Sequence, residues 1–450
     1  MSDTLAAFHH ADTGTAEHEW VARAEWGCVP SLSVDGTDTT HLVLVAAHPD
    51  DETLGGGGLL ATAAAADLRI DVVVLSAGAA SHPDSPTHTP GDLAALRVEE
   101  TRAALALLAP SARLHLVGLP GGCLESHEDA IVEAVVRTVG EHGPTTLIAA
   151  PWRHDGHGDH EAAGRAAAVA AHRTDARLLE YPIWLWHWAA PDAAPWPRFR
   201  VLPLARGVRA RKSHAISVHR SQVAPLSGDP GDEALLHPGM LEHFVRDRET
   251  FIVEPPAVDA VFDRVHGDAP DPWGVDDSWY EERKRDLTLA ALPRPRFRRA
   301  LEVGCSIGAL TARLASRCDA VLALDESAVA LSSASRRLRE TPNVRLDRAH
   351  LPEAWPDGRF DLVVVSEVGY FLSPERLRGL IARAEASLTD DGVVVLCHWR
   401  HPVVGWPLDG PRVHEIWRAT SSLGVVARHR EPDFLLDVLG NTSDHRQGGA

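Results

Sequence analysis

The chain has 450 residues and a formal net charge of −19, with 44% hydrophobic and 24% charged residues. This length exceeds one ordinary domain, so we expect two or three, each with its own core. The composition is typical of a soluble globular protein. The negative charge disfavours a general nucleic-acid binder and a protein that docks on anionic membranes.

The cysteines and the N-terminal residues indicate the cellular compartment of the protein. The five cysteines are scattered, and no CxxC pair occurs, which indicates reduced thiols and not a disulfide framework. The sequence MSDTLAAFHH lacks a basic region followed by an apolar one, so we expect no signal peptide. No apolar run reaches membrane-spanning length. We therefore expect a cytoplasmic protein.

Strand and helix patterns alternate through the first half of the chain. After a polar lead-in with one short helix near residues 17–25, we expect strands at residues 41–47, 71–77, 113–117, 146–150 and 178–188, and helices at residues 57–66, 92–108, 128–141, 161–172 and 206–222. This βαβα order predicts a mainly parallel sheet with helices on both faces, which is a doubly wound, Rossmann-like α/β fold.

A second αβ series follows a segment rich in proline and aspartate. Strands are expected at residues 299–303, 320–325, 343–346, 360–366 and 392–398, helices at 278–292, 310–317, 327–339 and 373–388, and a helix and two strands within 412–438. The predicted organisation is two α/β domains at residues 1–255 and 275–440, with a linker at 256–274 and a tail at 441–450.

The first candidate site begins with AHPDDE at residues 47–52, directly after an apolar strand. In an open α/β sheet, ligands bind at the loops that leave the carboxyl ends of the strands. A second motif, HGDH at residues 157–160, also follows an apolar strand. His48, Asp51 and His160 supply a His–Asp–His set, and a catalytic zinc site usually takes three protein ligands and keeps one position open.

The remaining polar residues suit amide hydrolysis. A divalent metal lowers the pKa of bound water and polarises a carbonyl. Asp50 would then be free to act as general base. His157 would stabilise the oxyanion or protonate the leaving amine, with Asp159 orienting its ring. The alternative is a turn with helix-capping aspartates, which two such motifs, each after an apolar strand, disfavour.

These motifs resemble those of a known family. AHPDDE at residues 47–52 and HGDHEAAG at 157–164 are similar to the PIG-L (LmbE-like) deacetylases, zinc hydrolases that remove N-acetyl groups from amino sugars and related conjugates. The resemblance covers residues 40–253. Gly158 stands where the family often has proline, and HRSQ at residues 219–222 matches a later family segment.

The resemblance implies zinc at His48, Asp51 and His160, with Asp50 as base and His157 as electrostatic catalyst. It also implies a small-molecule substrate, an N-acetylated amino sugar conjugate. A thiol conjugate or another small amide is the alternative substrate.

Two further features lie near this site. Trp184, Trp186 and Trp188 alternate within the strand expected at residues 178–188, so they would share one face of it. They suit stacking on a sugar ring, and packing in the core or at a domain interface is the alternative. The polar loop at residues 79–91 is a candidate lid.

The second candidate site is ALEVGCSIGALT at residues 300–311, which predicts a strand, a glycine turn and the start of a helix. Glycines let a backbone approach a ligand closely. Asp325 ends the next strand, where a carboxylate can bind two ribose hydroxyls. The glycine pattern gains weight from Asp325 and from FDLVVVSE at residues 360–367. A nicotinamide-dinucleotide domain is the alternative, but GxGxxG is not matched.

This half resembles class I S-adenosylmethionine-dependent methyltransferases over residues 270–430, and SEVGYFL and CHWRHP are most similar to NodS-like N-methyltransferases. The resemblance implies contacts to S-adenosylmethionine from Glu302, Gly304, Gly308 and Asp325. Candidates for orienting the acceptor amine or taking its proton are Glu367, Tyr370, His398 and His401, for each of which a structural role is the alternative.

We therefore expect a bifunctional enzyme that removes an N-acetyl group and methylates a nitrogen. An acetamide nitrogen is a poor nucleophile and a free amine is a good one, so hydrolysis would prepare the acceptor. The alternative is an active deacetylase whose second domain is an unrelated methyltransferase or a non-catalytic binding module.

Overall fold

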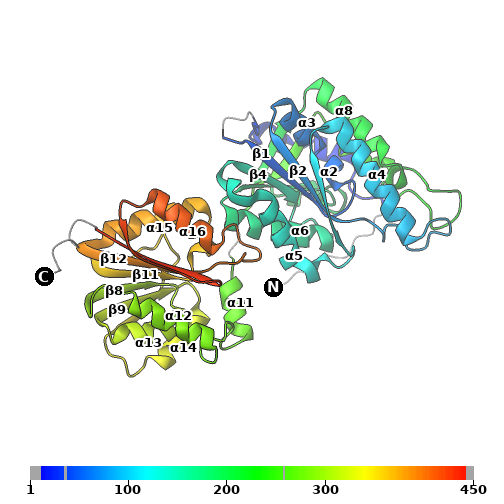
Figure 1. Ribbon diagram of the computed structural model, residues 1–450. Coiled ribbons are helices and arrows are strands. Elements are labelled where there is room, and N and C mark those ends of the chain that lie inside the picture. Colours follow the sequence, from blue (N-terminus) through cyan, green and yellow to red (C-terminus); the bar gives the residue numbers. More distant parts are fainter. Residues whose placement is uncertain (1–11, 35–37, 257–258, 442–450) are drawn as a thin grey trace. The chain divides into compact units, whose positions relative to one another are not determined.

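The computed structural model describes residues 12–34, 38–256 and 259–441. The chain forms two compact units, Met1–Ala257 and Val258–Ala450, and each contains one seven-stranded, mainly parallel sheet (Figure 1). The predicted fold class of two α/β domains is confirmed. Within the described ranges, no helix has the length and apolar character needed to cross a bilayer. All of the predicted tail except Asn441 lies outside these ranges.

The first sheet has the strand order β3-β2-β1-β4-β5-β7-β6. Its strands are β1 (His41–Ala46), β2 (Arg69–Ser76), β3 (Arg113–Leu119), β4 (Thr146–Pro151), β5 (Arg177–Tyr181), β6 (Phe199–Pro203) and β7 (Arg248–Ile252). Strands β1 to β5 pair in parallel, whereas β7 is antiparallel to both β5 and β6. The chain order reverses between β1 and β4, so the switch point of the sheet lies there.

The helices of the first unit are α1 (Glu17–Val21), α2 (Asp51–Leu54), α3 (Gly57–Ala65), α4 (Pro90–Leu108), α5 (Glu128–Val139), α6 (Gly158–Thr174), α7 (Leu185–Trp188), α8 (Arg206–Val218), α9 (Arg220–Val223) and α10 (Pro238–Glu242). Short 3-10 helices are η1 (Ala24–Cys28), η2 (Leu124–His127), η3 (Gly140–Thr145), η4 (Pro191–Ala193) and η5 (Trp196–Arg198).

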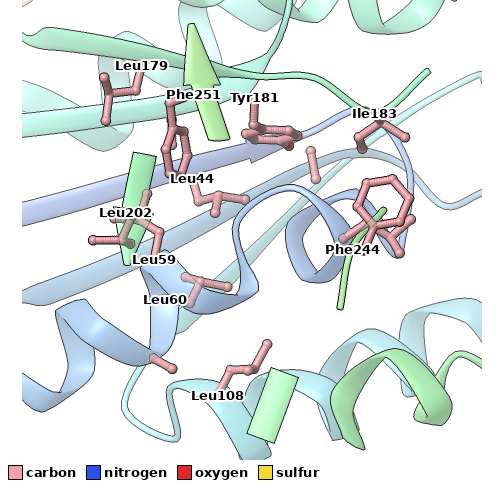
Figure 2. Packing of buried hydrophobic residues seen from close by; sticks show 14 of the residues in the cluster. Leu44, Leu59, Leu60, Leu108, Leu179, Tyr181, Ile183, Leu202, Phe244 and Phe251 are labelled. Atoms are coloured by element: carbon pink, nitrogen blue, oxygen red, sulfur yellow. The ribbon is translucent and has the colours of Figure 1, made fainter. Parts of the chain in front are cut away.

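Side chains of β1 alternate between two cores. Leu42 and Leu44 pack with residues of α3, α4 and α8, whereas Val43 and Val45 pack with α5 and α6. Figure 2 shows Leu44 in the first core, among labelled side chains from α3, α4, β5 and β7. Because helices cover both faces, the parallel strands are continuous apolar runs, which is why the sequence revealed them.

The glycine-rich turn that follows β1 is closely packed. A Cβ atom added to Gly55 would lie 2.0 Å from the Tyr181 ring, and one added to Gly56 would lie 2.3 Å from Leu44. At Gly58 the nearest atom would be a Leu204 methyl at 2.5 Å. The glycines therefore let α2 and α3 approach the sheet at distances that a side chain would prevent.

The strand predicted at residues 178–188 is wrong beyond Tyr181. The chain turns there and forms helix α7. Trp186 is buried, with its ring 4.8 Å from that of Trp20, centroid to centroid, in an edge-on arrangement. The three tryptophans thus do not share a strand face, and Trp186 belongs to the core.

The second sheet has the order β10-β9-β8-β11-β12-β14-β13, with β14 antiparallel to both its neighbours. Its strands are β8 (Phe297–Val303), β9 (Cys318–Asp325), β10 (Val344–Arg348), β11 (Phe360–Ser366), β12 (Leu388–Trp399), β13 (Gly424–Arg430) and β14 (Phe434–Gly440). Its helices are α11 (Val261–Asp268), α12 (Trp279–Ala290), α13 (Ala309–Ala315), α14 (Ala328–Arg337), η6 (Gly369–Phe371), α15 (Pro374–Ser387) and α16 (Gly410–Thr420). The switch point lies between β8 and β11.

The segment predicted as a linker at residues 256–274 contains helix α11. Asp263 accepts a hydrogen bond from the Ser327 hydroxyl at 2.7 Å, and the Phe262 ring lies 4.8 Å from that of Phe371. These long-range contacts fix the helix against the rest of the second unit. The local sequence gave no sign of them.

A buried ion pair supports the glycine-rich turn. Lys212 Nζ donates to Glu249 at 2.6 Å and to the Leu54 carbonyl at 2.7 Å, and Glu249 also accepts the backbone N–H groups of Gly58 and Leu59. Glu249→Ala would leave the Lys212 ammonium buried without its carboxylate. We expect a loss of about 3–5 kcal/mol in the free energy of unfolding, measured by urea denaturation of the full chain.

The control is the double variant Lys212→Met with Glu249→Ala, which removes the uncompensated charge. It should lose less than Glu249→Ala alone. Equal losses in the two variants would show that the ion pair does not stabilise the turn.

Candidate functional site

The first site lies at the switch point of the first sheet, where β1 and β4 end. His48 and Asp51 follow β1, and His160 lies in the first turn of α6 after β4. One donor atom from each of the three lies within 4.8 Å of the others. His160 Nε2 is 3.4 Å from Asp51 Oδ1, and His48 Nδ1 is 3.7 Å from Asp51 Oδ2. Donors about 3.4 Å apart are what tetrahedral zinc requires.

Each histidine of this set is oriented by a buried carboxylate. Asp159 lies 2.9 Å from His48 Nε2, and Asp155 lies 2.8 Å from His160 Nδ1. These contacts leave His48 Nδ1 and His160 Nε2 available beside Asp51, which is the usual outer-shell arrangement of metal-binding histidines. The residues present therefore fit a divalent metal such as zinc.

The sequence led us to expect that Asp159 orients the His157 ring, but in the structure it orients His48 instead. Its carboxylate contacts His48 and accepts the backbone N–H groups of Gly122 and Leu124 at 2.6 and 3.0 Å. His157 precedes α6 in an extended conformation, and no hydrogen bond joins it to Asp159 among the described residues.

Asp155 is the functional residue that the sequence reasoning missed. It is fully buried and accepts the backbone N–H groups of Ile183, Trp184 and Leu185, each at 3.0 Å. The same carboxylate thus fixes His160 and the turn that leads into α7. The available signal was a carboxylate five residues before His160 in RHDGHGDH.

Asp50 has the environment of a general base. It is buried, with φ of 123°, a conformation that non-glycine residues rarely adopt. Arg97 Nη2 lies 3.3 Å from Asp50 Oδ1 and donates to the Pro49 carbonyl at 2.6 Å. Burial raises the pKa of Asp50 to about 6, and Arg97 limits that rise. A carboxylate with a pKa near the working pH is an effective proton acceptor.

Glu52 and the HRSQ segment hold the loop that carries Asp50. Glu52 accepts the Asp50 backbone N–H at 2.9 Å, and His219 Nε2 lies 3.3 Å from Glu52. Ser221 donates its hydroxyl to Glu100 of α4 at 2.6 Å. HRSQ is therefore a support for the metal-site loop.

His157 lies beside the metal-ligand set. Its ring centroid is 4.7 Å from that of His160 and 5.2 Å from that of His48. Burial lowers its pKa to about 3, and within the described part of the chain its buried Nδ1 has no hydrogen-bond partner. The half-buried Trp184 ring is nearly parallel to it at 6.4 Å. A neutral imidazole with an unused nitrogen suits a contact to substrate.

The loop at residues 79–91, predicted as a lid, is anchored. Asp232 accepts hydrogen bonds from the hydroxyls of Thr87 and Ser227 at 2.5 and 2.6 Å. His82 is buried and contacts the Glu233 carbonyl at 3.0 Å. The loop is thus tied to the segment before α10.

The second site lies at the ends of β8 and β9. Glu302 is buried near the end of β8, burial raises its pKa to about 8, and among the described residues its Oε2 has no hydrogen-bond partner. Gly304 and Gly308 have φ of +74° and +79°. Asp325 accepts the backbone N–H groups of Ser306 and Ser327 at 2.7 and 2.9 Å. All four predicted contact residues flank one turn. The Glu302 Oε2 atom, which has no partner among the described residues, suits a polar ligand.

His398 has a structural environment. It is fully buried, accepts the Gly369 backbone N–H at Nε2, and contacts His414, which in turn contacts Asp437 at 3.0 Å. Burial lowers the pKa of His398 well below its ordinary value. His401 is exposed and lies 3.0 Å from Asp433. Neither arrangement favours proton transfer with an acceptor.

Two family descriptions match this chain. The PIG-L family, described as GlcNAc-PI de-N-acetylase, matches residues 43–171, and the family described as Nodulation protein S (NodS) matches residues 258–406. The chain carries a PIG-L domain followed by a NodS-like methyltransferase domain. The metal-ligand set lies in the first match and the glycine turn in the second.

Individual relatives match the second domain. Nodulation protein S of Sinorhizobium fredii is 33% identical over 105 residues, which are 23% of this chain and 49% of that protein. The Rhizobium tropici protein of the same name is 31% identical over 105 residues, 23% of this chain and 44% of that protein. The chain thus spans about half the length of these curated relatives.

Two solved structures are also similar to part of this chain. N-methyltransferase NodS from Bradyrhizobium japonicum in complex with S-adenosyl-L-homocysteine is 25% identical, covering 40% of this chain and 96% of that one, with a TM-score of 0.37. A Pseudomonas syringae protein described as a methyltransferase is 45% identical, covering 36% of this chain and 99% of that one, with a TM-score of 0.33.

The hydrogen bond that His160 Nδ1 donates to Asp155 predicts a measurable effect on metal binding. Asp155→Asn keeps the shape of the side chain but removes the charge that orients the imidazole and raises its basicity. We expect the affinity for Zn²⁺ to fall about 10- to 100-fold, measured by competition with a fluorescent chelator.

Asp67→Asn is the matched control, because Asp67 is exposed in the turn after α3. It should bind Zn²⁺ with unchanged affinity. Wild-type affinity in Asp155→Asn would mean that the carboxylate does not support the metal site.

Proposed function

We propose that the first domain is a zinc-dependent N-deacetylase that acts on an N-acetylated amino sugar or its conjugate. The observation that carries this proposal is the convergence of His48, Asp51 and His160 at the switch point, with the strained Asp50 beside them. Three ligands and an adjacent base are the parts that metal-assisted amide hydrolysis needs. The PIG-L match supports the amino sugar class of substrate.

A bound zinc ion would polarise the acetyl carbonyl and lower the pKa of a water molecule. Asp50 would accept a proton from that water, since its raised pKa matches a base working near neutral pH. His157, neutral and with a ring nitrogen that has no partner among the described residues, would donate a hydrogen bond to the developing oxyanion, while the proton accepted by Asp50 would pass to the leaving amine. Asp159 and Asp155 keep the ligand histidines in the required tautomers.

We further propose that the second domain transfers a methyl group to nitrogen. S-adenosylmethionine would supply the electrophilic methyl group. Gly304 and Gly308 let the backbone approach it closely, and Asp325 lies where a carboxylate binds ribose hydroxyls. Glu302, whose pKa of about 8 keeps it mainly protonated near neutral pH, offers a buried carboxyl group to the site.

The two reactions form a chemical sequence. Deacetylation converts an acetamide into an amine, and only the amine has a lone pair available for methyl transfer. We propose that the amine released by the first domain, or one like it, is the acceptor of the second. The scattered cysteines favour a cytoplasmic setting for both steps.

A panel of N-acetylated amino sugar conjugates, incubated with Zn²⁺ and S-adenosylmethionine and analysed by mass spectrometry, tests both proposals together. Loss of acetyl reports the first domain and gain of methyl reports the second. Methylation of oxygen acceptors alone would refute the sequential proposal. If isothermal titration shows no binding of S-adenosylmethionine, and Asp325→Ala leaves the products of the incubation unchanged, the second domain is a non-catalytic module.

Asp50→Ala separates catalysis from metal binding. Because Asp50 takes the proton and His48, Asp51 and His160 hold the metal, we expect hydrolysis to fall at least about 10²- to 10⁴-fold while zinc stays bound. The rate of acetate release and the zinc content by mass spectrometry are measured on the same sample.

Treatment of the wild-type protein with a chelator provides the complementary control. It should abolish hydrolysis, and added Zn²⁺ should restore it. Unchanged hydrolysis in Asp50→Ala would refute the assignment of the base.

A further inference from the structure

Glu367 is the first residue after β11, directly beside the predicted methyl-donor site. Strands β8 and β11 are parallel neighbours, with Val303 paired to Val365, so Gly304 lies beside Ser366, the residue before Glu367. A Cβ added to Gly304 would lie 2.0 Å from Val368. The loop that carries Glu367 therefore packs on the glycine turn.

The backbone and side chain of Glu367 are both constrained. Its φ is +59°, in the left-handed region that non-glycine residues seldom occupy. Lys284 Nζ donates to Oε1 at 2.8 Å, the Trp399 backbone N–H donates to Oε2 at 3.0 Å, and the Tyr370 hydroxyl donates to Oε2. Backbone strain held by several partners is a frequent property of functional positions.

The charges around Glu367 do not cancel. Lys284 also donates to Glu281 at 2.7 Å, so two carboxylates share one ammonium group. Burial would lower the pKa of Lys284, but Glu367 and Glu281 outweigh burial and raise that pKa above its ordinary value. Lys284 thus stays charged, and the three groups together carry one net negative charge.

Aromatic rings border this anionic group. Lys284 Nζ lies 5.1 Å from the centre of the Tyr280 ring. The centres of the Tyr280 and Trp399 rings are 5.6 Å apart. Within the described residues, the buried Tyr280 hydroxyl has no hydrogen-bond partner. The Glu367 side chain keeps 27% of its surface exposed. A partly open carboxylate among aromatic rings has the chemistry that attracts an amine or ammonium group.

We propose that Glu367 accepts a hydrogen bond from the acceptor amine and makes the second domain select amines over acetamides. This inference rests on the proposed N-methylation. The N–H group donates to Glu367, which leaves the nitrogen lone pair free to face the methyl group. The N–C bond forms as the S–CH₃ bond breaks, the electron pair of that bond passes to sulfur, and the product is an N-methylammonium held by Glu367.

The other role for this carboxylate is purely structural, as an ion pair that fixes α12 to the end of β11. The two roles differ in what they do to ligand binding. A structural pair would affect cofactor binding and thermal stability, whereas an acceptor contact would affect the binding of the amine alone.

The test compares wild type and Glu367→Gln as full chains saturated with S-adenosylhomocysteine, titrated calorimetrically with D-glucosamine or N-acetyl-D-glucosamine. Glu367→Gln should weaken D-glucosamine binding about 10- to 100-fold, because it replaces a charge-assisted hydrogen bond with a neutral one. Affinity for S-adenosylhomocysteine should stay within about 2-fold, as should binding of N-acetyl-D-glucosamine. Any binding to the first domain is common to both proteins and cancels in the comparison.

Glu281→Gln is the matched control, since it removes the other carboxylate on Lys284 without altering the end of β11. It should weaken D-glucosamine binding less than Glu367→Gln does. Equal losses in the two variants, or unchanged D-glucosamine binding in Glu367→Gln, would overturn the inference.

Methyl transfer to D-glucosamine distinguishes this failure from that of the proposed function. If the wild type methylates the amine and Glu367→Gln has the same KM, only the role of Glu367 is refuted. If the wild type methylates no amine, the proposed N-methylation fails as well.

Discussion

Parallel hydrogen bonding between β1 and β4 is the constraint on which the candidate metal site depends. It aligns His41 with Thr146 and brings together two loops more than 100 residues apart in sequence. Because α3 and α6 pack on opposite faces of the sheet, the chain leaves β1 and β4 toward opposite sides. The second domain repeats this arrangement between β8 and β11 with different residues, so one backbone geometry presents two chemistries.

Buried carboxylates then fix the loops that this pairing brings together. Asp155 accepts three backbone N–H groups as well as a histidine, and Glu249 accepts two together with the Lys212 ammonium. Each joins elements far apart in the chain. A carboxylate with several donors keeps its position, so the loops of the first site are held before any ligand arrives.

The sequence predicted those features that follow from local pattern. The buried parallel strands were continuous apolar runs, and the ligand residues His48, Asp51 and His160 stood directly after them. The features it did not predict depend on tertiary contacts. Helix α11 is held by the second unit, and the turn after Tyr181 is stabilised by Asp155, which lies 26 residues earlier. The pairing of Asp159 with His48, in place of His157, likewise needs both loops in position.

The backbone of Asp50 has a wider consequence. A φ of 123° is strained for any residue with a Cβ, and such strain typically amounts to about 1–3 kcal/mol. Glycine at this position would release it, so a search for more stable variants would select against the residue we assign as the base. Thermostability and hydrolysis thus compete at one position, and a designer who wants both must gain stability elsewhere in the fold.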